Sequence, residues 1–501
     1  MTTITLHPDF RVGPVDRRVF GSFVEHLGRC VYTGIYEPDH ATADEFGFRR
    51  DVADLTRELG VTMLRYPGGN FVSNYTWEDA VGPVEQRKPF LDLAWRTVEP
   101  NLVGTDEFLQ YCEREGIEPM MAVNLGTRGI DAAIGLLEYC NGEAGTKWAD
   151  MRIANGREKP YGVKLWCLGN EMDGPWQIGH KNADEYGRLA AATGRAMKQV
   201  DPSIELVACG SSSMMMDTFG SWERTVLSHC YDVVDHISMH AYYEELDGDR
   251  ASFLGSGTAM EKFVERVVAS ADSIGAEKRS DKRITISFDE WNVWYLVSRF
   301  PGEANLPVQR DAPRIIEDRY SALDAVVVGD LLVTLLRHTD RVAVACLAQL
   351  VNVIAPIMTE PGGEAWRQTT FHPFATAARL AQGDALQVQV TDGPVMATDK
   401  HGDVPVVTAA ATVDPETGAL ALFVTNRSAA EQTVTLRHPG ATARIEGGTA
   451  VLADQAGARE NQADAEAYGP VDALPVAHGD GLITLTLAPE SWTAFHGTLS
   501  A

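Results

Sequence analysis

The sequence predicts an α/β chain in which a (β/α)8 TIM barrel is followed by a C-terminal antiparallel β-sandwich of jelly-roll-like type. Between residues 18 and 384, short apolar runs alternate with longer amphipathic stretches, which is typical of strand–helix units around a parallel sheet. From residue 385 the pattern changes to short alternating segments separated by Gly, Pro, Asn and Asp, which favours antiparallel strands. The length of 501 residues suits two or three domains, or one large barrel with an appendage.

Eight apolar runs fit the strands of such a barrel better than those of a doubly wound sheet. No GxGxxG motif follows a predicted strand, and neither GxxxxGKS nor GxxxxGKT occurs, so nucleotide-binding folds lose their usual support. The predicted strands cover residues 19–24, 61–65, 119–123, 163–168, 205–209, 233–239, 284–288 and 342–347. Helices are expected between them at residues 49–59, 106–115, 182–199, 260–274 and 319–337.

The C-terminal part of the chain is rich in predicted strands. Segments such as residues 419–425 alternate between apolar and polar side chains, as strands with one buried face do. The first residues alternate in the same way and are expected to add a strand to the sandwich. The predicted domains are therefore a catalytic barrel over residues 18–384 and a sandwich over residues 385–501, together with the N-terminal strand in residues 1–17.

Composition excludes several classes of function. The chain carries 70 acidic and 43 basic side chains, and this net charge of −27 argues against nucleic acids and anionic membranes as partners, because both need a positive field. The most apolar helical stretch, residues 322–336, is shorter than the roughly 20 residues that span a bilayer. The N-terminus lacks the apolar run of a signal peptide, and the seven cysteines form no CxxC pair. A soluble cytoplasmic protein with reduced, buried cysteines is expected.

Polar side chains follow almost every predicted barrel strand. The C-terminal ends of barrel strands meet at one mouth, where the chemistry of such barrels takes place. Polar groups there cost stability unless a ligand or each other satisfies them, and amides, carboxylates and indoles together suit a polyhydroxylated ligand. No HExxH or clustered Cys/His spacing occurs, so no metal and no other cofactor is expected. The residues past the runs are Glu25 with His26, Asn70, Asn124, Asn170 with Glu171, Ser211 with Ser212, His240 with Tyr242, Asp289 with Glu290 and Asn292, and Gln349 with Asn352.

Glu171 and Glu290 form the most informative pair, because they end predicted strands four and seven. Hydrolysis of a glycosidic bond requires one carboxylic acid that protonates the leaving oxygen and one carboxylate that attacks or activates water. A separation of about 5–5.5 Å between the carboxyl groups would retain the anomeric configuration, and about 6.5–9.5 Å would invert it. The sequence leaves both outcomes open.

Two segments around these glutamates resemble the acid/base and nucleophile segments of glycoside hydrolase family 51, whose best-known members are α-L-arabinofuranosidases. Their sequences are WCLGNEMDGPWQ at residues 166–177 and ISFDEWNVWY at residues 286–295. Three further segments resemble other blocks of the family, namely FGSFVEHLG at 20–28, LRYPGGN at 64–70 and AQLVNVIAP at 348–356. The likeness extends from about residue 15 to the end of the chain, and five blocks in the family's order are highly specific.

The resemblance implies an exo-acting enzyme that removes terminal non-reducing α-L-arabinofuranosyl residues from arabinoxylan- and arabinan-derived oligosaccharides. It implies a retaining double displacement through a glycosyl-enzyme intermediate, with Glu171 as acid/base and Glu290 as nucleophile. It also implies a role in hemicellulose degradation and arabinan catabolism, and a homo-oligomer, frequently a hexamer. By the same resemblance, the arabinose hydroxyls would be held by Glu25, Asn70, Asn170, Tyr242 and Gln349, with Asn170 on the 2-hydroxyl.

Other interpretations stay open. Trp294 is predicted as a sugar platform, whereas Trp77, Trp176 and Trp291 are expected in the core. His26 and His240 are expected to orient carboxylates. In the structural alternatives, Glu25 forms an ion pair with Arg29 or Arg65, and the side chain of Asn70 caps a turn. Tyr243 contacts the ligand instead of Tyr242, and the amide of Gln349 is satisfied by neighbours in the barrel interior. The functional alternatives are a β-xylosidase or endo-glucanase on the same carboxylates, and a catalytically silent carbohydrate-binding barrel, which the presence of both glutamates disfavours.

Overall fold

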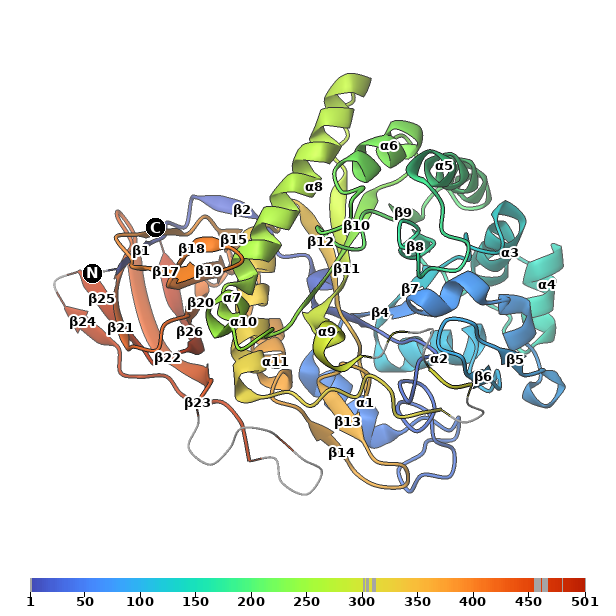
Figure 1. Cartoon of the computed structure of the whole chain (residues 1–501), viewed down its shortest axis with the longest axis horizontal. Helices are drawn as coiled ribbons and strands as arrows, with labels where there is room; N and C mark the ends of the chain where they lie inside the picture. The colour runs from blue at the N-terminus through green and yellow to red at the C-terminus, as the bar shows by residue number, and fades with distance from the viewer. Residues whose placement is uncertain are drawn as a thin grey trace.

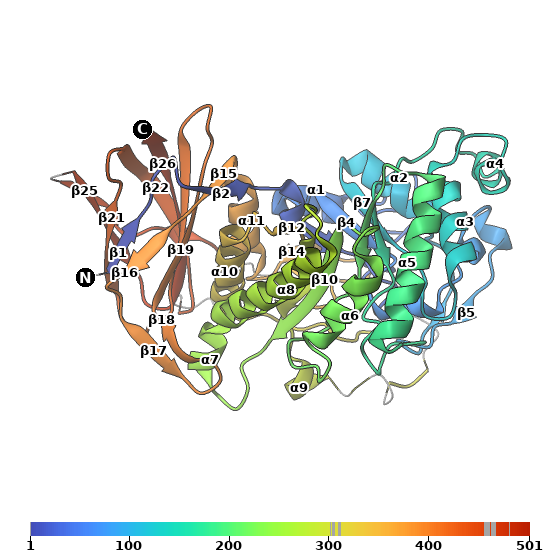
Figure 2. The ribbon, with the colours of Figure 1, turned by 90° about the horizontal axis from the view of Figure 1, so that it is seen from above.

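The computed structural model describes residues 2–300, 302, 306–308, 312–454, 461, 467–479 and 481–500. Eight parallel strands close into a barrel, and helices surround it (Figure 1, Figure 2). Each of the eight predicted segments supplies one barrel strand, so the predicted fold class is confirmed. Around the barrel the strands are β3 (Gly21–Phe23), β4 (Met63–Tyr66), β7 (Glu118–Ala122), β8 (Leu165–Leu168), β9 (Glu205–Ala208), β10 (His236–Tyr243), β11 (Thr285–Val293) and β12 (Val342–Leu347), which pairs again with β3.

Two barrel strands run further than the apolar pattern predicts. The apolar segments end at residues 239 and 288, whereas β10 continues to Tyr243 and β11 to Val293. The strands stay paired through these extra residues, with His240 opposite Glu290. Backbone hydrogen bonds carry the extension, and an apolar periodicity cannot detect it because several of the added side chains are polar. As a result, polar side chains stand on regular strands at the barrel mouth.

The helices begin and end at residues whose chemistry favours those positions. Helix α5 (Ala183–Val200) begins after Asn182, whose side chain accepts a hydrogen bond from the backbone N–H of Glu185. Helix α1 (Arg50–Leu59) ends at Gly60, whose φ of 81° is left-handed. The other helices are α2 (Thr105–Glu115), α3 (Ile130–Asn141), α4 (Lys147–Ala154), α6 (Ser221–Cys230), α7 (Arg250–Leu254), α8 (Ser256–Lys278), α9 (Leu296–Arg299), α10 (Ala322–Arg337) and α11 (Phe371–Leu380), with short 3-10 turns η1 (Arg17–Phe20), η2 (Asn70–Asn74), η3 (Trp77–Ala80) and η4 (Val84–Gln86).

Two further sheets, of five and seven strands, form the sandwich. The N-terminal strand β1 (Thr2–Thr5) lies in the smaller sheet and pairs in parallel with β21, which departs from a purely antiparallel sandwich. A strand from the far end of the chain has no hairpin to its neighbour, so either direction is open to it.

The smaller sheet has the order β16 (Gln389–Thr391), β1, β21 (Gln432–Arg437), β25 (Leu482–Leu487) and β24 (Ala477–Gly479). The larger sheet has the order β2 (Arg11–Pro14), β15 (Asp384–Leu386), β19 (Val407–Val413), β20 (Ala419–Asn426), β26 (Ser491–Ser500), β22 (Thr442–Leu452) and β23 (Val471–Asp472). Three separate strand pairs are β5 (Phe90–Leu91) with β6 (Val98–Glu99), β13 (Ile357–Thr359) with β14 (Ala365–Arg367), and β17 (Val395–Thr398) with β18 (Gly402–Pro405).

The larger apolar core comprises the barrel, its helices and the contact with the sandwich, and a smaller core lies within the sandwich. All seven cysteines are buried and free of disulfides, as predicted. Among the helices that the structure describes, none has the length and apolar character needed to cross a membrane.

Helix α10 lies between the barrel and the sandwich (Figure 2). Every residue of α10 except Arg337 is buried, as expected of a helix that is apolar on all sides. At Gly329 a Cβ atom would lie 2.4 Å from Cγ of Trp492, so only glycine allows the helix to approach strand β26 this closely. Asp330 on α10 accepts hydrogen bonds from Arg427 Nη2 and from the Thr408 hydroxyl, both at 2.7 Å. This buried ion pair is one of the polar links between the two parts.

Replacing Arg427 with methionine is expected to lower the free energy of unfolding by about 3–5 kcal/mol, because Asp330 would remain as an unpaired buried charge. The matched control is Arg195→Met, whose partner Asp232 is largely exposed, so this change is expected to cost at most about 1 kcal/mol. Urea unfolding followed by tryptophan fluorescence measures both variants. Equal losses would contradict the structural importance of the buried pair.

Candidate active site

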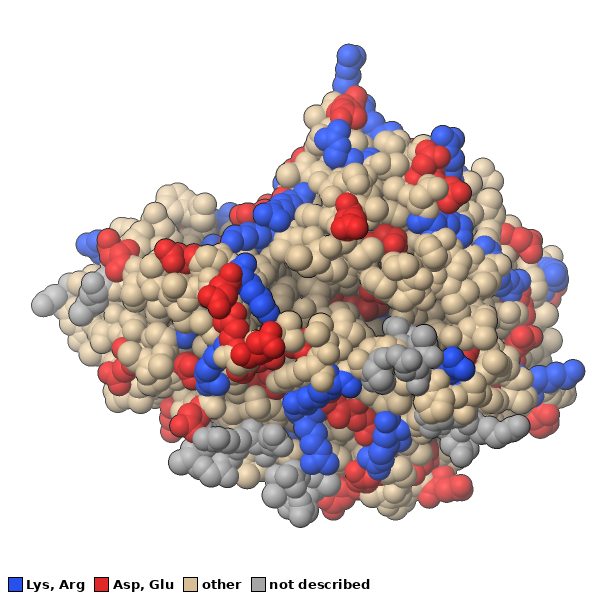
Figure 3. All heavy atoms as spheres, in the orientation of Figure 1, with Lys and Arg blue, Asp and Glu red and all other residues tan. Residues whose placement is uncertain are grey.

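A cavity of about 520 Å³ opens at the C-terminal ends of the barrel strands. Figure 3 shows this face hollowed near its centre, with acidic side chains visible inside. Seven of the eight predicted site residues line the cavity, namely Glu25, Asn70, Glu171, Tyr242, Glu290, Trp294 and Gln349. The eighth, Asn170, is not part of the lining. It is 1% exposed, and its side-chain oxygen accepts a 2.6 Å hydrogen bond from Arg65 Nη2.

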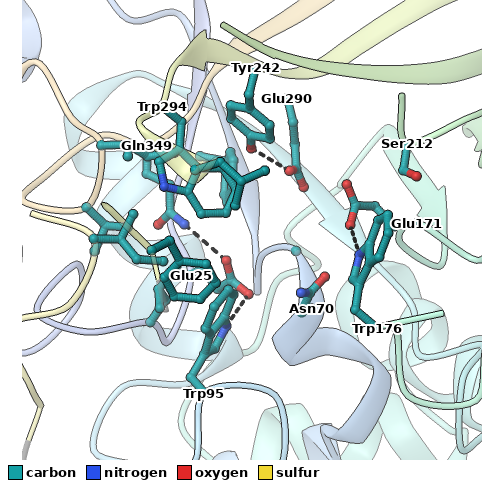
Figure 4. Close-up of a pocket in the computed structure, with 18 of the residues that line it drawn as sticks. Glu25, Asn70, Trp95, Glu171, Trp176, Ser212, Tyr242, Glu290, Trp294 and Gln349 are labelled. Carbon is teal, nitrogen blue, oxygen red and sulfur yellow. Dashed lines mark hydrogen bonds between the residues drawn. The ribbon is translucent and has the colours of Figure 1, made fainter. Parts of the chain in front are cut away.

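Glu171 and Glu290 lie close together in this cavity (Figure 4). One carboxyl oxygen of each lies within 4.8 Å of the other. Glu290 stands on β11, whereas Glu171 follows β8 in a left-handed backbone conformation with a φ of 42°. Such a conformation costs a non-glycine residue of order 1–3 kcal/mol, and it persists where the surrounding structure fixes it, often at functional sites.

Two hydrogen-bond donors and a histidine ring surround the carboxylate of Glu290. Arg65 Nη1 lies 2.9 Å from Oε1, and the Tyr242 hydroxyl donates to Oε2 at 2.7 Å. His240 Nδ1 lies 3.5 Å from the same Oε2. Burial raises the pKa of Glu290, but the charges of His240 and Arg65 oppose this increase and favour the ionised form.

His240 lies among three carboxyl groups. Its Nδ1 is 2.8 Å from Glu171 Oε1, and its Nε2 is 2.9 Å from Asp289 Oδ1. Burial alone would lower the pKa of His240, but the negative charge of Glu290 and the bonds to Asp289 and Glu171 hold that pKa well above its ordinary value. These contacts favour the protonated ring, in which both nitrogens donate. The prediction that His240 orients carboxylates is consistent with these two contacts.

The cavity offers little to a metal ion. In the part of the chain that the structure describes, Glu171, His240 and Glu290 form the one cluster of three potential metal ligands. A metal requires a neutral imidazole with a free lone pair, whereas both nitrogens of His240 face carboxylate oxygens, which favours a proton on each. These side chains fit proton transfer better than metal binding.

Glu25 is a third buried carboxyl group of the cavity, on the far side from Glu171 (Figure 4). Its Oε1 accepts from the backbone N–H of Phe71 and from Trp95 Nε1, both at 2.9 Å, and its Oε2 lies 3.0 Å from Gln349 Nε2. Burial raises the pKa of Glu25 to about 8, so this carboxyl group is largely protonated at neutral pH. Among the described residues, none donates a hydrogen bond to the buried Gln349 Oε1, which leaves an acceptor for a ligand hydroxyl.

The structural alternatives for the lining residues are mostly wrong. Glu25 contacts neither arginine, because Arg29 pairs with Glu317 at 2.7 Å and Arg65 pairs with Glu290. The side-chain oxygen of Asn70 faces Asn170 Nδ2 at 3.4 Å instead of capping a turn. Tyr242 lines the cavity, whereas its neighbour Tyr243 does not.

Aromatic side chains form much of the wall. Trp294 lines the cavity as predicted, and its ring packs edge-on against Tyr242 at a centroid distance of 4.9 Å. The core assignment of Trp176 is wrong: this indole is 41% exposed, lines the cavity and donates to Glu171 Oε2 at 2.6 Å. Its position in the segment at residues 166–177, beside Glu171, was the available signal. No sequence feature indicated that Trp95 lines the cavity, because it lies between β5 and β6, far in sequence from every predicted strand end.

Glu25→Gln is expected to change how stability depends on pH. The folded state holds the proton of Glu25 more tightly than the unfolded chain does, so the wild type loses stability as pH rises from about 4.5 to about 8. The variant lacks this loss. The thermal midpoint of the variant minus that of the wild type should therefore increase as pH rises through this window. Calorimetry at several pH values measures the difference, with exposed Glu416→Gln as a control that keeps the wild-type slope. Parallel curves for Glu25→Gln and wild type would contradict a protonated Glu25.

Comparisons with known proteins agree along almost the whole chain. The model described as α-L-arabinofuranosidase 1 domain matches residues 55–252, and the one described as α-L-arabinofuranosidase C-terminal domain matches residues 289–491. An intracellular exo-α-(1→5)-L-arabinofuranosidase from Streptomyces lividans is 54% identical over 98% of this chain and 74% of its own length. An exo-α-(1→6)-L-arabinofuranosidase from Bifidobacterium longum is 51% identical over 97% of this chain and 95% of its own.

A solved structure supports the same assignment. The structure of a family 51 α-L-arabinofuranosidase from Bifidobacterium longum matches this one with a TM-score of 0.94 at 47% identity, and the match covers 99% of each chain. Its similarity extends over the barrel and the sandwich alike. The chain belongs to the α-L-arabinofuranosidases of glycoside hydrolase family 51.

Proposed function

We propose that the protein is a retaining exo-α-L-arabinofuranosidase that removes terminal non-reducing α-L-arabinofuranosyl residues from arabinoxylan- and arabinan-derived oligosaccharides. The observation that carries the retaining mechanism is the approach of a Glu171 oxygen to within 4.8 Å of a Glu290 oxygen. Retaining glycosidases place their carboxyl groups about 5–5.5 Å apart, and inverting enzymes need about 6.5–9.5 Å to accommodate a water molecule.

Glu290 is the nucleophile in the first step. Arg65 and Tyr242 hold its carboxylate and favour the ionised form that attacks the anomeric carbon. Glu171 carries a proton and donates it to the glycosidic oxygen as the bond from C1 to that oxygen breaks. The leaving sugar departs with its hydroxyl restored, and an ester joins the arabinosyl C1 to Glu290.

Glu171 acts as a base in the second step. Its ionised carboxylate takes a proton from a water molecule, whose oxygen bonds to C1 as the ester bond to Glu290 breaks. The Glu290 carboxylate and the protonated Glu171 are then restored. Two displacements at C1 leave the product with the configuration of the substrate.

The arabinofuranosyl ring occupies the side of the cavity opposite Trp176. Glu25 can donate its proton to a hydroxyl, and the unpartnered Gln349 Oε1 can accept from one. Asn70 completes the hydrogen bonds, while Trp294 and Tyr242 cover the apolar face of the sugar. Asn170 lies behind the lining, with its Nδ2 3.4 Å from the side-chain oxygen of Asn70, so it orients Asn70, and the 2-hydroxyl contact that the resemblance implies for Asn170 stays a prediction. The leaving group lies beside Glu171 and Trp176.

The finer assignments come from the relatives. Their names give 1→5 and 1→6 linkages, and we propose an α-linked oligosaccharide of either type as substrate. We propose a cytoplasmic location, which is supported by relatives named as intracellular. Oligosaccharides derived from hemicellulose and arabinan are the substrates that we propose for an enzyme in that location. The division into a barrel over residues 18–384 and a sandwich over residues 385–501 with 1–17, and the homohexamer, stay predictions.

Wild-type enzyme is expected to hydrolyse p-nitrophenyl α-L-arabinofuranoside much faster than p-nitrophenyl β-D-xylopyranoside. Glu290→Ala is expected to lose several orders of magnitude in kcat, because it removes one member of a catalytic set. Exposed Asp232→Asn serves as the matched acidic control and should keep wild-type activity. A preference for the xyloside would overturn the assigned sugar, and activity in Glu290→Ala would overturn the assigned nucleophile.

Methanol added to the reaction is expected to yield methyl α-L-arabinofuranoside. The alcohol intercepts the glycosyl enzyme from the face on which water attacks, so the product keeps the α configuration after two displacements. Proton NMR of the stable methyl glycoside distinguishes the anomers. The β anomer as the initial product would rule out the retaining mechanism.

A further inference from the structure

The steps of the double displacement give no role to His240, although it contacts both proposed catalytic carboxyl groups. It stands on β10 directly opposite Glu290 and is 2% exposed. Replacing a buried ionic group with an apolar side chain of similar volume often costs little stability. His240 nevertheless stands between carboxyl groups on both edges of its ring. The arrangement therefore calls for a functional explanation.

Asp289 fixes one edge of the ring. His240 Nε2 lies 2.9 Å from Asp289 Oδ1, and Asp289 is itself 1% exposed. The second oxygen of Asp289 lies 3.7 Å from Arg65 Nε and 3.6 Å from Cys167 Sγ. Asp289 thus stays ionised in the barrel interior, and it requires a proton on His240 Nε2.

The other edge of the ring faces the two catalytic carboxyl groups. Nδ1 lies 2.8 Å from Glu171 Oε1 and 3.5 Å from Glu290 Oε2. Because Nδ1 always donates, Glu171 Oε1 can only accept. The exchangeable proton of Glu171 is then confined to Oε2, the oxygen beside Trp176.

We propose that His240, held as an imidazolium by Asp289, is a positioning residue that keeps the acid/base proton on Glu171 Oε2 and provides a fixed positive charge beside both catalytic carboxyl groups. This inference rests on the proposed function, and it adds a residue to its mechanism. His240 neither gains nor loses a proton at any step.

The charge balance of the cycle explains the value of such a cation. Before the first step Glu290 is ionised and Glu171 is neutral. When the Glu171 proton moves to the leaving oxygen and Glu290 forms the ester, the single negative charge moves to Glu171. The second step returns it to Glu290 as Glu171 takes a proton from water. A cation 2.8 Å from one carboxyl oxygen and 3.5 Å from the other pairs with this charge in both states, without reorganisation.

The other charged groups near the ring remain in place when His240 is replaced. A change in the pH profile of such a variant therefore reports the loss of the imidazolium charge. The ionisable and charged groups that surround the ring are Glu171 and Asp173 after β8, Cys167 on β8, Asp289 and Glu290 on β11, Arg65 on β4, and Tyr242 on β10 itself.

His240→Asn tests the inference, because the asparagine amide keeps a donor near the Nδ1 position but carries no charge. Loss of a neighbouring positive charge favours the protonated form of a carboxyl group. Both limbs of the bell-shaped dependence of kcat/KM on pH should therefore move to higher pH, by about 1–3 units. At the wild-type optimum, kcat/KM for p-nitrophenyl α-L-arabinofuranoside should fall about 100-fold or more.

His236→Asn is the matched control. His236 is a buried histidine on the same strand, and it pairs with Glu205 at the opposite end of the barrel. This variant should keep the wild-type pH dependence of kcat/KM. Asp289→Asn removes the anion that holds the proton on His240, so its bell should move in the same direction as that of His240→Asn.

If the pH dependence of kcat/KM is unchanged in soluble, folded His240→Asn or Asp289→Asn, the inference is overturned, even if kcat falls. Nitrogen-15 NMR of histidine-labelled wild type provides a test that needs no folded variant. It should show one histidine with both ring nitrogens protonated at about pH 8, and the absence of such a signal would also overturn the inference. Failure of the wild type to cleave the arabinofuranoside would instead overturn the proposed function.

Discussion

The ion pair between Arg65 and Glu290 is the interaction around which the barrel mouth is arranged. It joins β4 to β11 across the barrel, and both side chains are almost completely buried. Removing two charges from water costs several kcal/mol per ion unless each finds good partners. Arg65 therefore also donates to Asn170 and faces Asp289, and Glu290 also accepts from Tyr242. Side chains from four barrel strands become mutually dependent through these contacts.

The carboxyl groups of this one cavity have different electrostatic surroundings. Burial raises the pKa of Glu290, and the charges of His240 and Arg65 and the hydrogen bond from Tyr242 oppose that increase. No cation of the described residues opposes the effect of burial on Glu25, whose pKa is raised to about 8, so this carboxyl group is mostly neutral. Environment rather than residue type assigns these roles, as it does wherever two carboxyl groups perform different tasks in one site. A nucleophile and a hydroxyl donor can therefore coexist a few ångströms apart.

Much of the fold could be predicted from the sequence, because apolar periodicity reports burial and burial defines barrel strands. All eight segments correspond to strands, and their polar ends identified seven of the residues that line the cavity. The prediction failed where periodicity carries no information. Strands β10 and β11 extend through polar residues held by backbone pairing, and Trp95 comes from a strand pair whose position depends on contacts distant in sequence.

The sequence by itself determined the barrel, the strand-rich C-terminal part and the identity of the two central glutamates, because each depends on local pattern or on the order of strand ends. Only the tertiary structure decided how close Glu171 and Glu290 come, that Glu25 pairs with neither Arg29 nor Arg65, and that Trp176 faces the cavity. It also decided that His240 bridges Glu171 and Asp289. These properties depend on distance and desolvation across strands far apart in the chain, and neither quantity is encoded in the spacing of residues along it.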